Sequence, residues 1–454
     1  MIAKDKIFRE YDIRGVVGQD FDIEFAYNLG KALAHKLKEN GDNLKFGVGR
    51  DCRLSGPEIQ KEILRGLTDS GVTAVDCGMG PTPQLYFSVH HLNLGGGVQI
   101  TASHNPGDQN GFKMMIGKGT LSGASITELR DLAKQDLETV EEKGQIEEFK
   151  AQDAYLEELV NRSKSFMGKR KLKVVVDAGN GVGGISGPEL LRQLGCEVIE
   201  LFTEPDGRFP NHHPDPTVME NIVELSKTVV EQKADLGIGW DGDADRIGVV
   251  NEKGEIIYGD MLLVIYGREL LKDIKSPTII ADVKCSELFF SDLKAKGANP
   301  VMAKTGHSLI KAKLKELDAE LAGEMSGHIF FSHRYYGFDD ALHASARLVE
   351  IMSKTDSAIS ELISDLPIMY STPEIRVECP DELKFEITKQ AVNSFPEYEV
   401  NTLDGVRITF EKGWGLVRAS NTQASLVMRF EAETKDLLQC YKSLVEERVL
   451  PLIG

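Results

Sequence analysis

A pattern of strand, helix and strand recurs three times along the chain, and it limits the folds that the chain can adopt. In the first copy, an apolar strand is expected over residues 44–51 and ends in Asp51. A helix is expected over residues 56–70, and a second strand over residues 72–77. Apolar strands that alternate with helices are typical of parallel βαβ units. The first copy therefore predicts a layer of α/β structure.

The same order of elements returns twice, again with an aspartate at the end of the first strand. These aspartates are Asp177 and Asp282. The strand, helix and strand of the second copy are expected over residues 173–177, 188–194 and 197–201, and those of the third over residues 278–282, 286–296 and 300–303. Three recurrences with the same terminal residue favour a shared architecture over chance similarity, and they predict an α/β fold.

In each copy a later strand leads directly into a polar loop. The strands are expected over residues 96–100, 234–240 and 319–322, and the loops over residues 101–106, 241–246 and 323–328. Ligands of α/β sheets bind at the carboxyl ends of the strands. We therefore expect the three loops to face one shared cleft.

The chain after residue 367 follows a different pattern, with strands expected over residues 373–378, 405–411 and 425–430 and a closing amphipathic helix. This alternation indicates a smaller α+β domain. Residues 137–150 are rich in Glu and predict a zone of helix and linker. The predicted domains are residues 1–150, 151–253, 254–367 and 368–454.

The net charge limits the partners of the chain, because 53 Lys and Arg residues stand against 71 Asp and Glu residues, for a net charge of −18 at pH 7. Such a chain repels nucleic acid and anionic lipid, so we expect neither as a partner. It also disfavours small phosphorylated ligands, unless a site reverses the sign locally. The first residues lack the apolar stretch of an export signal, and none of the six cysteines forms a CxxC pair. We therefore expect a cytoplasmic protein.

The loop over residues 241–246 has carboxylates at alternate positions, Asp241, Asp243 and Asp245. At about 5 Å and an effective dielectric constant of about 20, each like-charged pair costs on the order of 3 kcal/mol. A divalent cation would neutralise this crowding, and all-oxygen ligands suit Mg²⁺ or Ca²⁺. An EF-hand is disfavoured, since Arg246 stands where its tight turn needs Gly; a solvated acidic turn is the other alternative. The pattern favours a catalytic Mg²⁺ loop.

The other polar loops carry further candidate groups. Ser103 follows a strand in a turn made by Asn105-Pro106, and a serine that carries phosphate near Mg²⁺, Lys and His can act as a phosphoryl relay. The loop over residues 323–328 offers Glu324, Ser326 and His328, which suit the hydroxyls of a sugar. A fourth loop, with Arg418, Ser420, Asn421 and Thr422, has the groups of an anion pocket. In isolation, an ordinary polar turn is the alternative for each of these loops.

These four loops, in this order, resemble the signatures of the α-D-phosphohexomutase family, and the resemblance extends over essentially the whole chain. The chain looks like the bacterial phosphomannomutase/phosphoglucomutase branch. Met325 favours that branch, because phosphoglucosamine mutases usually have Gln between the Glu and the Ser. One departure is Gln423-Ala-Ser, since relatives often carry Pro shortly after the Thr of the phosphate loop.

The resemblance implies a fold and a set of roles. The fold is three similar mixed α/β domains and a C-terminal, TATA-box-binding-protein-like α+β domain around a central cleft. Ser103 would be phosphorylated, and Mg²⁺ would be held by Ser103 with Asp241, Asp243 and Asp245. The implied catalytic residues are Ser103, His104, Lys113, Arg14 and Arg246. The implied substrate-binding residues are Tyr11, Lys284, His307, Glu324, Ser326, His328, Arg418, Ser420, Asn421 and Thr422.

The implied reaction interconverts the 1-phosphate and the 6-phosphate of mannose or glucose, with hexose 1,6-bisphosphate as intermediate and activator. A lysine with a lowered pKa is expected as general base, and the basic residues of the site are expected to make it locally positive. We expect a monomer that acts on small sugar phosphates. The alternatives are a phosphoglucosamine mutase, a Mg²⁺-dependent sugar phosphatase or phosphotransferase with Asp241 as nucleophile, and a non-catalytic sugar-phosphate-binding protein.

Overall fold

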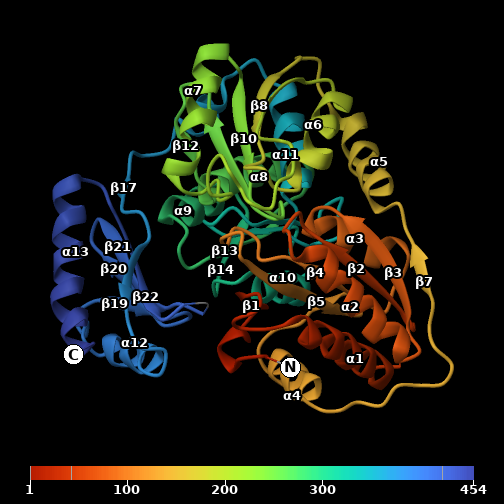
Figure 1. The fold of residues 1–454 in the computed structure, drawn as a ribbon. Coiled ribbons are helices and arrows are strands. Elements are labelled where there is room, and N and C mark those ends of the chain that lie inside the picture. The colour runs from red at the N-terminus through yellow and green to blue at the C-terminus, as the bar shows by residue number, and fades with distance from the viewer. Residues whose placement is uncertain (1, 42, 422, 454) are drawn as a thin grey trace. The chain divides into compact units, whose positions relative to one another are not determined.

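The chain divides into two compact units in a computed structural model that describes residues 2–41, 43–421 and 423–453. The first unit consists of Met1–Leu262 and Ser326–Leu362, and the second of Leu263–Met325 and Ile363–Gly454. Two sheets build the first unit. The strands of a third repeat and a C-terminal sheet build the second (Figure 1).

The first sheet has the strand order β1-β5-β4-β2-β3-β7. These strands are β1 (Ile13–Val16), β2 (Lys45–Arg50), β3 (Thr73–Met79), β4 (Gly96–Ile100), β5 (Gln109–Ile116) and β7 (Ile146–Glu148), and β6 (Gly119–Thr120) pairs with β5. The central strand β2 is parallel to β3 and β4, while β5 runs antiparallel to β4. The sheet is therefore mixed, with its parallel part at the repeated strand–helix–strand pattern.

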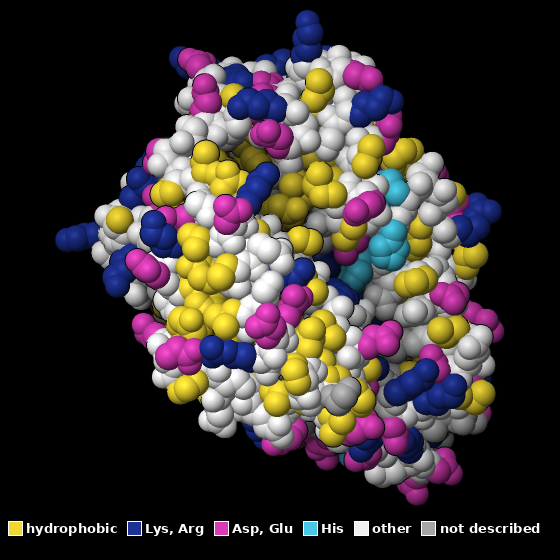
Figure 2. All heavy atoms as spheres, turned by 90° about the vertical axis from the view of Figure 1, so that its left-hand side faces the viewer, with side chains coloured by type: hydrophobic (Ala, Val, Ile, Leu, Met, Phe, Trp, Pro, Cys, Tyr) yellow, Lys and Arg dark blue, Asp and Glu magenta, His cyan; other side chains and the backbone are white. Residues whose placement is uncertain are grey.

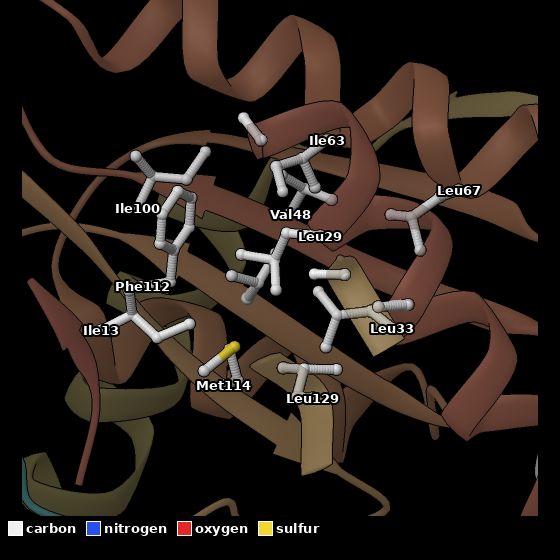
Figure 3. Packing of buried hydrophobic residues seen from close by; sticks show 14 of the residues in the cluster. Ile13, Leu29, Leu33, Val48, Ile63, Leu67, Ile100, Phe112, Met114 and Leu129 are labelled. Atoms are coloured by element: carbon white, nitrogen blue, oxygen red, sulfur yellow. The ribbon is translucent and has the colours of Figure 1, made fainter. Parts of the chain in front are cut away.

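Alternation along these strands separates the two faces of the first sheet. On one face, side chains such as Val48, Ile100 and Phe112 form a core with α1 (Ile23–Glu39), α2 (Gly56–Asp69) and α4 (Ala124–Ala133) (Figure 3). On the other face, α3 (Thr82–His91) lies against glycines of β2 and β4. A Cβ added at Gly97 would lie 2.9 Å from Cγ2 of Val89. The small residues of these strands therefore allow the close approach of α3.

The second sheet has the order β12-β11-β10-β8-β9. Its elements are β8 (Lys173–Asp177), α6 (Gly183–Gln193), β9 (Glu197–Leu201), α7 (Val223–Gln232), β10 (Leu236–Trp240), β11 (Ile247–Asn251) and β12 (Ile256–Ile257). The start predicted for α6 at residue 188 is wrong, because the helix begins at Gly183 and has Pro188 inside it. Gly183 and Gly187 would each clash with the Trp240 side chain if they carried a Cβ. These glycines belong to a closely packed helix, where the sequence suggested a loop.

In the third repeat, β13 (Thr278–Asp282) is parallel to β14 (Asn299–Ala303) and β15 (Leu321–Gly323). Its helices are α9 (Glu287–Ala295), which Ser286 caps, and α10 (His307–Glu316), and α8 (Gly259–Asp273) precedes β13 in the chain. Each central strand has two parallel neighbours from its own repeat. These neighbours are β3 and β4 for β2, β9 and β10 for β8, and β14 and β15 for β13. This shared arrangement confirms the repeat that the sequence predicted.

The C-terminal part of the chain is α+β, as predicted. Its sheet has the order β17-β22-β21-β20-β19, and β18 pairs with β22. Its strands are β17 (Tyr370–Ser371), β18 (Ile375–Glu378), β19 (Glu399–Asn401), β20 (Val406–Phe410), β21 (Gly413–Ala419) and β22 (Ser425–Ala432). The helices α12 (Lys384–Val392) and α13 (Lys435–Val449) share one apolar core with the sheet (Figure 1). Three of these elements, α12, β19 and β21, were not among those predicted from the sequence.

These sheets and their helices confirm the predicted fold class, which is three α/β parts followed by an α+β part. The prediction of a helix within residues 137–150 is wrong, since the segment contains only the short strand β7, which pairs with β3. Within the described residues, no helix is both long and apolar enough to cross a membrane.

A buried carboxylate connects two helices of the first unit, α5 (Ala151–Ser163) and α11 (Ala341–Ser353). Asp340 caps α11 by accepting a hydrogen bond of 2.8 Å from the backbone N of His343. The same carboxylate accepts hydrogen bonds from the hydroxyls of Tyr155, at 2.8 Å, and Tyr335, at 2.6 Å. Burial raises the pKa of Asp340 to about 6, and these hydrogen bonds oppose the rise.

We expect Asp340 to make stability depend on pH. The folded chain binds a proton there between pH 4 and 6 that the unfolded chain releases, so the free energy of unfolding falls as pH rises through that window. The fall attributable to Asp340 is about 3 kcal/mol. Urea unfolding of the wild type and of Asp340→Asn at pH 4, 5, 6 and 7 should show their difference changing by that amount. A difference that stays constant with pH, as expected for the exposed control Asp356→Asn, would contradict this account.

Candidate active site

Ser103 lies in a buried turn directly after β4. Its backbone has a φ of +51°, and the residue is 1% exposed. Its hydroxyl donates a hydrogen bond of 2.6 Å to Oδ2 of Asp241, and its Oγ lies 3.2 Å from Nδ1 of His104. The predicted pairing of the serine loop with the acidic loop therefore exists within the first unit.

Strand β1 of the first sheet brings a basic side chain to this turn. Arg14, on β1, donates from Nη1 to the carbonyl of Ala102 and to Oδ1 of Asn105, both at 3.3 Å. Its Nε also donates to Oδ2 of Asp12 at 2.7 Å. Arg14 therefore supports the loop around Ser103 from the edge of the sheet.

The acidic loop between β10 and β11 buries its three carboxylates completely. Asp241 Oδ1 accepts hydrogen bonds of 3.0 Å from the backbone N atoms of Asp245 and Arg246. Asp243 accepts one of 2.5 Å from the Thr82 hydroxyl. These bonds fix the loop so that ligand oxygens of all three aspartates lie within 4.8 Å of one another.

A glycine lets the two loops meet. A Cβ added at Gly242 would lie only 2.4 Å from the carbonyl oxygen of Ser103. The backbone N of Gly242 donates to the carbonyl of Pro214 at 3.2 Å, and its carbonyl accepts from the N of Val182 at 3.1 Å. Only glycine fits where the acidic loop passes the serine turn.

Lys113, on β5, supplies positive charge to the acidic loop. Its ammonium donates to Oδ2 of Asp243 at 2.7 Å and also to Oδ2 of Asp245. Burial alone would lower the pKa of Lys113, but these carboxylates raise it. The expectation of a lysine with a lowered pKa is therefore wrong for Lys113, which is an ammonium at pH 7.

The carboxylates respond differently to the same surroundings. Burial, with the neighbouring Asp243 and Asp245, raises the pKa of Asp241 well above its usual range. Burial also acts on Asp243, but the Lys113 ammonium holds the pKa of that carboxyl low. His104 has a pKa well below its usual value because of burial and the nearby Arg246 and Arg14, so its imidazole is neutral at pH 7.

The acidic loop fits a hard divalent cation. Oδ1 of Asp243 and Oδ1 of Asp245 are both buried, and neither has a hydrogen-bond partner among the described residues. Together with Asp241 they offer only oxygen ligands, which is the donor set of Mg²⁺ or Ca²⁺. Unsatisfied buried carboxylate oxygens are costly, and a bound cation would satisfy them.

A chain of side chains orients Arg246 beside this loop. Its Nε donates to Nε2 of His328 at 3.0 Å, so the proton of that imidazole is on Nδ1. Nδ1 lies 3.2 Å from Oδ2 of Asp339 and 3.6 Å from Oδ1 of Asp245. The order carboxylate, imidazole, guanidinium fixes both the tautomer of His328 and the direction of Arg246.

The second unit contains further predicted residues, starting with Lys284 after β13. Its ammonium forms an ion pair of 2.7 Å with Glu374 and lies 3.8 Å from Oδ2 of Asp282. Burial would lower the pKa of Lys284, but Glu374 and Asp282 raise it. Conversely, Lys284 lowers the pKa of Glu374 to about 2.

Glu324 and His307 belong to neighbouring loops of this second unit. Oε1 of Glu324 accepts a hydrogen bond of 2.6 Å from the backbone N of Gly306, which immediately precedes His307 at the start of α10. Thr305 donates through its backbone N to Oδ2 of Asp404 at 3.0 Å. Both predicted side chains are buried, at 2% and 7% exposure.

Arg418 is near the end of strand β21. The sequence had suggested that it belongs to a loop. Its Nε donates to Oδ2 of Asp404 at 2.9 Å. Its Nη2 is buried and has no hydrogen-bond partner among the described residues. Beyond the strand, the Oγ of Ser420 accepts from the N of Gln423 at 3.1 Å. Asn421 is half-buried, and the predicted Thr422 lies outside the described residues.

Two predicted residues remain in the first unit, Tyr11, which is buried, and Ser326, which is half-buried. The boundary between the units falls between Met325 and Ser326. The loop over residues 323–328 therefore has Glu324 in one unit and His328 in the other. The structure gathers Ser103, His104, Arg14, Lys113, Asp241, Asp243, Asp245, Arg246 and His328 in the first unit, and Lys284, His307, Glu324, Arg418, Ser420 and Asn421 in the second.

Comparison with known proteins extends over nearly the whole chain. Family descriptions for the phosphoglucomutase/phosphomannomutase alpha/beta/alpha domains I, II and III match residues 5–139, 153–254 and 258–370, and the one for the C-terminal domain matches residues 374–447. A phosphomannomutase/phosphoglucomutase of Pseudomonas syringae pv. tomato is 46% identical over 441 residues, which cover 96% of this chain and 94% of that protein. The chain belongs to the α-D-phosphohexomutase family.

Other relatives agree with this membership. A phosphoglucomutase of Neisseria gonorrhoeae is 44% identical over 96% of this chain and 95% of its own length. The crystal structure of a phosphoglucomutase/phosphomannomutase family protein from Burkholderia thailandensis has 40% sequence identity and a TM-score of 0.92, and the match covers 100% of this chain and 99% of that one. Relatives and chain are thus matched along their full lengths.

Several basic groups that are expected to make the site locally positive have carboxylate partners within their own units. Arg14 is paired with Asp12, and Lys113 with Asp243 and Asp245. In the second unit, Lys284 is paired with Glu374, and Arg418 with Asp404. Acidic and basic side chains are also interspersed over the face that Figure 2 shows. Within each unit, these basic groups are therefore held in place by carboxylates.

Sequence reasoning missed the residues that orient the predicted ones. They include Arg53, Thr82, Asp339, Glu374 and Asp404. Of these, only Asp339 had a local signal, since the pair Asp339-Asp340 directly precedes a helix. The other partners are far from their targets in the sequence, and nothing in the local pattern connects them.

Proposed function

We propose that this phosphohexomutase interconverts hexose 1-phosphate and hexose 6-phosphate, with mannose and glucose as the sugars. The relatives of 44–46% identity that carry the names phosphomannomutase/phosphoglucomutase and phosphoglucomutase support this proposal. The observation that carries it is the hydrogen bond of 2.6 Å between the Ser103 hydroxyl and the buried Asp241. It places a nucleophilic oxygen against a cation-binding loop, as an isomerase that moves a phosphoryl group requires.

Ser103 is the proposed carrier of the phosphoryl group. The P–O bond of phosphoserine breaks as a new P–O bond forms to the free hydroxyl of the substrate, and the proton of that hydroxyl passes through a general base to the departing Ser103 oxygen. The product of this step is hexose 1,6-bisphosphate, which also serves as the activator that loads Ser103. When Ser103 takes the other phosphoryl group, its hydroxyl proton must leave, and the neutral imidazole of His104 is 3.2 Å away. We assign Lys113 and Arg14 to charge stabilisation.

The acidic loop is the proposed Mg²⁺ site, with Asp241, Asp243 and Asp245 as ligands together with the phosphate on Ser103. Bound Mg²⁺ would offset negative charge on the transferring group. The orphaned oxygens of Asp243 and Asp245 support this assignment. Arg246, oriented by His328, is the proposed partner of the same phosphoryl group.

The second unit is the proposed holder of the rest of the substrate. Arg418, with Ser420, Asn421 and Thr422, would bind the phosphate that is not transferred, and the buried, unpartnered Nη2 of Arg418 supports this role. Glu324 and Ser326 would bind sugar hydroxyls. The other proposed contacts of the sugar phosphate are Tyr11, Lys284, His307 and His328.

We also propose that the enzyme is a cytoplasmic monomer that acts on small sugar phosphates and has no nucleic-acid or membrane partner. The net charge of −18 supports the last point, because it opposes association with polyanions.

Replacing Ser103 tests the relay. We expect Ser103→Ala to lose at least about a thousandfold in mutase kcat, because the substitution removes the hydroxyl that is proposed to carry the phosphoryl group. A coupled assay with glucose 1-phosphate and mannose 1-phosphate measures the loss. The control is Ser163→Ala, which removes a buried hydroxyl without a hydrogen-bond partner among the described residues of the same unit. Undiminished activity in Ser103→Ala would rule out the relay.

Replacing Arg418 tests the phosphate pocket. Arg418→Ala removes a guanidinium that binds the substrate before and during transfer alike, so we expect KM to rise about 10- to 100-fold with kcat changed far less. Arg448→Ala, on α13, removes an arginine bonded to Glu397 and should leave both constants unchanged. An unchanged KM in folded Arg418→Ala would remove Arg418 from the pocket.

A further inference from the structure

The central strand of each repeated layer ends at a buried aspartate: Asp51 directly after β2, Asp177 at the end of β8 and Asp282 at the end of β13. They are 0%, 2% and 0% exposed. We propose that each aspartate is a positioning residue that sets the backbone of the functional loop in its own layer. The loops concerned are the serine loop, the acidic loop and the Glu324 loop. Their chemical roles rest on the proposed function, whereas their geometry does not.

Asp51 controls the serine loop through two intermediaries. Its Oδ2 accepts a hydrogen bond of 2.7 Å from the Thr101 hydroxyl, and the oxygen of that hydroxyl accepts one of 2.9 Å from the backbone N of Ser103. Its two oxygens also accept from the backbone N of Arg53, at 2.9 Å, and from Nε of Arg53, at 3.0 Å. One carboxylate thus directs both a hydroxyl and a guanidinium towards the loop.

The guanidinium of Arg53 holds the other side of the serine loop. Arg53 is 0% exposed, and its Nη2 donates to the carbonyl of Ser103 at 2.8 Å. The remaining acceptors are the carbonyls of Asn105 at 2.6 Å, Pro106 at 2.5 Å and Gln109 at 2.8 Å. Ser103 needs this support, because its φ of +51° is unusual for a residue with a side chain. Asp51 therefore fixes the N–H of Ser103 through Thr101 and the C=O of Ser103 through Arg53.

Asp177 acts in the same way on the acidic loop. Its Oδ1 accepts from the backbone N of Gly179 at 2.8 Å, and its carboxylate lies 3.0 Å from Nε2 of His212. These contacts order the two segments that clamp Gly242, whose N and C=O bond to Pro214 and Val182. The glycine between Asp241 and Asp243 is thus held on both sides by structure that Asp177 organises.

Asp282 acts on the Glu324 loop. Its Oδ1 accepts from the backbone N of Met325 at 3.1 Å, and its Oδ2 accepts from the Thr305 hydroxyl at 2.8 Å. Thr305 is followed by Gly306, whose N donates to the Glu324 carboxylate at 2.6 Å. Asp282 therefore fixes the residue after Glu324 and the turn that binds its side chain.

A carboxylate suits all three places because it only accepts hydrogen bonds, and each of these aspartates faces donors alone. An Asn has the same shape, but its NH₂ group would point at an N–H or O–H donor of the loop. The substitution Asp→Asn therefore disturbs the loop while it leaves packing volume unchanged. Asp235 offers a matched control. It directly precedes β10 and so lies at the edge of the second sheet opposite to Asp177, where it accepts a hydrogen bond of 2.7 Å from the backbone N of Lys173.

The test compares Asp51→Asn, Asp177→Asn, Asp282→Asn and the control Asp235→Asn in the full chain. Hydrogen–deuterium exchange followed by mass spectrometry reads each loop directly. We expect at least tenfold faster exchange over residues 101–109 in Asp51→Asn, over 241–246 in Asp177→Asn and over 323–328 in Asp282→Asn. Each variant should leave the other two loops as in the wild type, and Asp235→Asn should leave all three unchanged.

We expect each variant to change a different functional quantity, as it changes the exchange of a different loop. Asp51→Asn should lower kcat at least tenfold with KM within about twofold, and Asp282→Asn should mainly raise KM. Asp177→Asn should weaken Mg²⁺ binding at least tenfold in calorimetry with MgCl₂ alone. Where a variant does not fold, Thr101→Val replaces Asp51→Asn, Thr305→Val replaces Asp282→Asn, and His212→Phe replaces Asp177→Asn.

Loop-specific exchange would support the proposal even if the wild type showed no mutase activity, a result that would overturn only the proposed function. Exchange that rises equally in all three loops, or in none, would overturn the inference whatever the activity. The same fall in kcat, rise in KM and weakening of Mg²⁺ binding in all three variants would also overturn it, because this result would indicate general destabilisation.

Discussion

Three buried carboxylates within 4.8 Å of one another are the constraint on which the site in the first unit depends. Their mutual repulsion must be offset, and the structure does so with the Lys113 ammonium, backbone N–H groups and the hydroxyls of Ser103 and Thr82. Two carboxylate oxygens without hydrogen-bond partners among the described residues leave room in this balance for a divalent cation. The Ser103 hydroxyl is bonded to the same loop, so the proposed cation site and the proposed phosphoryl carrier lie in one hydrogen-bonded structure.

In the second unit, basic side chains are buried and held in place by carboxylates within an acidic chain. Lys284 and Arg418 are each held by one carboxylate, and the guanidinium of Arg418 keeps one nitrogen without a partner in the described structure. The net charge of the whole chain therefore does not describe the proposed phosphate contacts, whose cations are buried and oriented by carboxylates.

Much of this arrangement could be predicted from local pattern. The strands β8 and β13 end at the aspartates that the sequence marked, because apolar runs and terminal polar residues are local signals. The start of α6 could not be predicted, because its glycines reflect contact with the distant Trp240. Arg53 was missed for a similar reason, since its partners are backbone carbonyls some 50 residues further along the chain, and a carbonyl has no sequence signature.

The central claim is that Ser103, and not Asp241, carries the phosphoryl group. Incubation with glucose 1,6-bisphosphate, followed by digestion and peptide mass spectrometry, tests it most directly. The account predicts one added phosphoryl group on the peptide with Ser103, stable to hydroxylamine as a phosphate ester is. A phosphoryl group on Asp241 that hydroxylamine removes, or no phosphorylation of Ser103 at all, would contradict it.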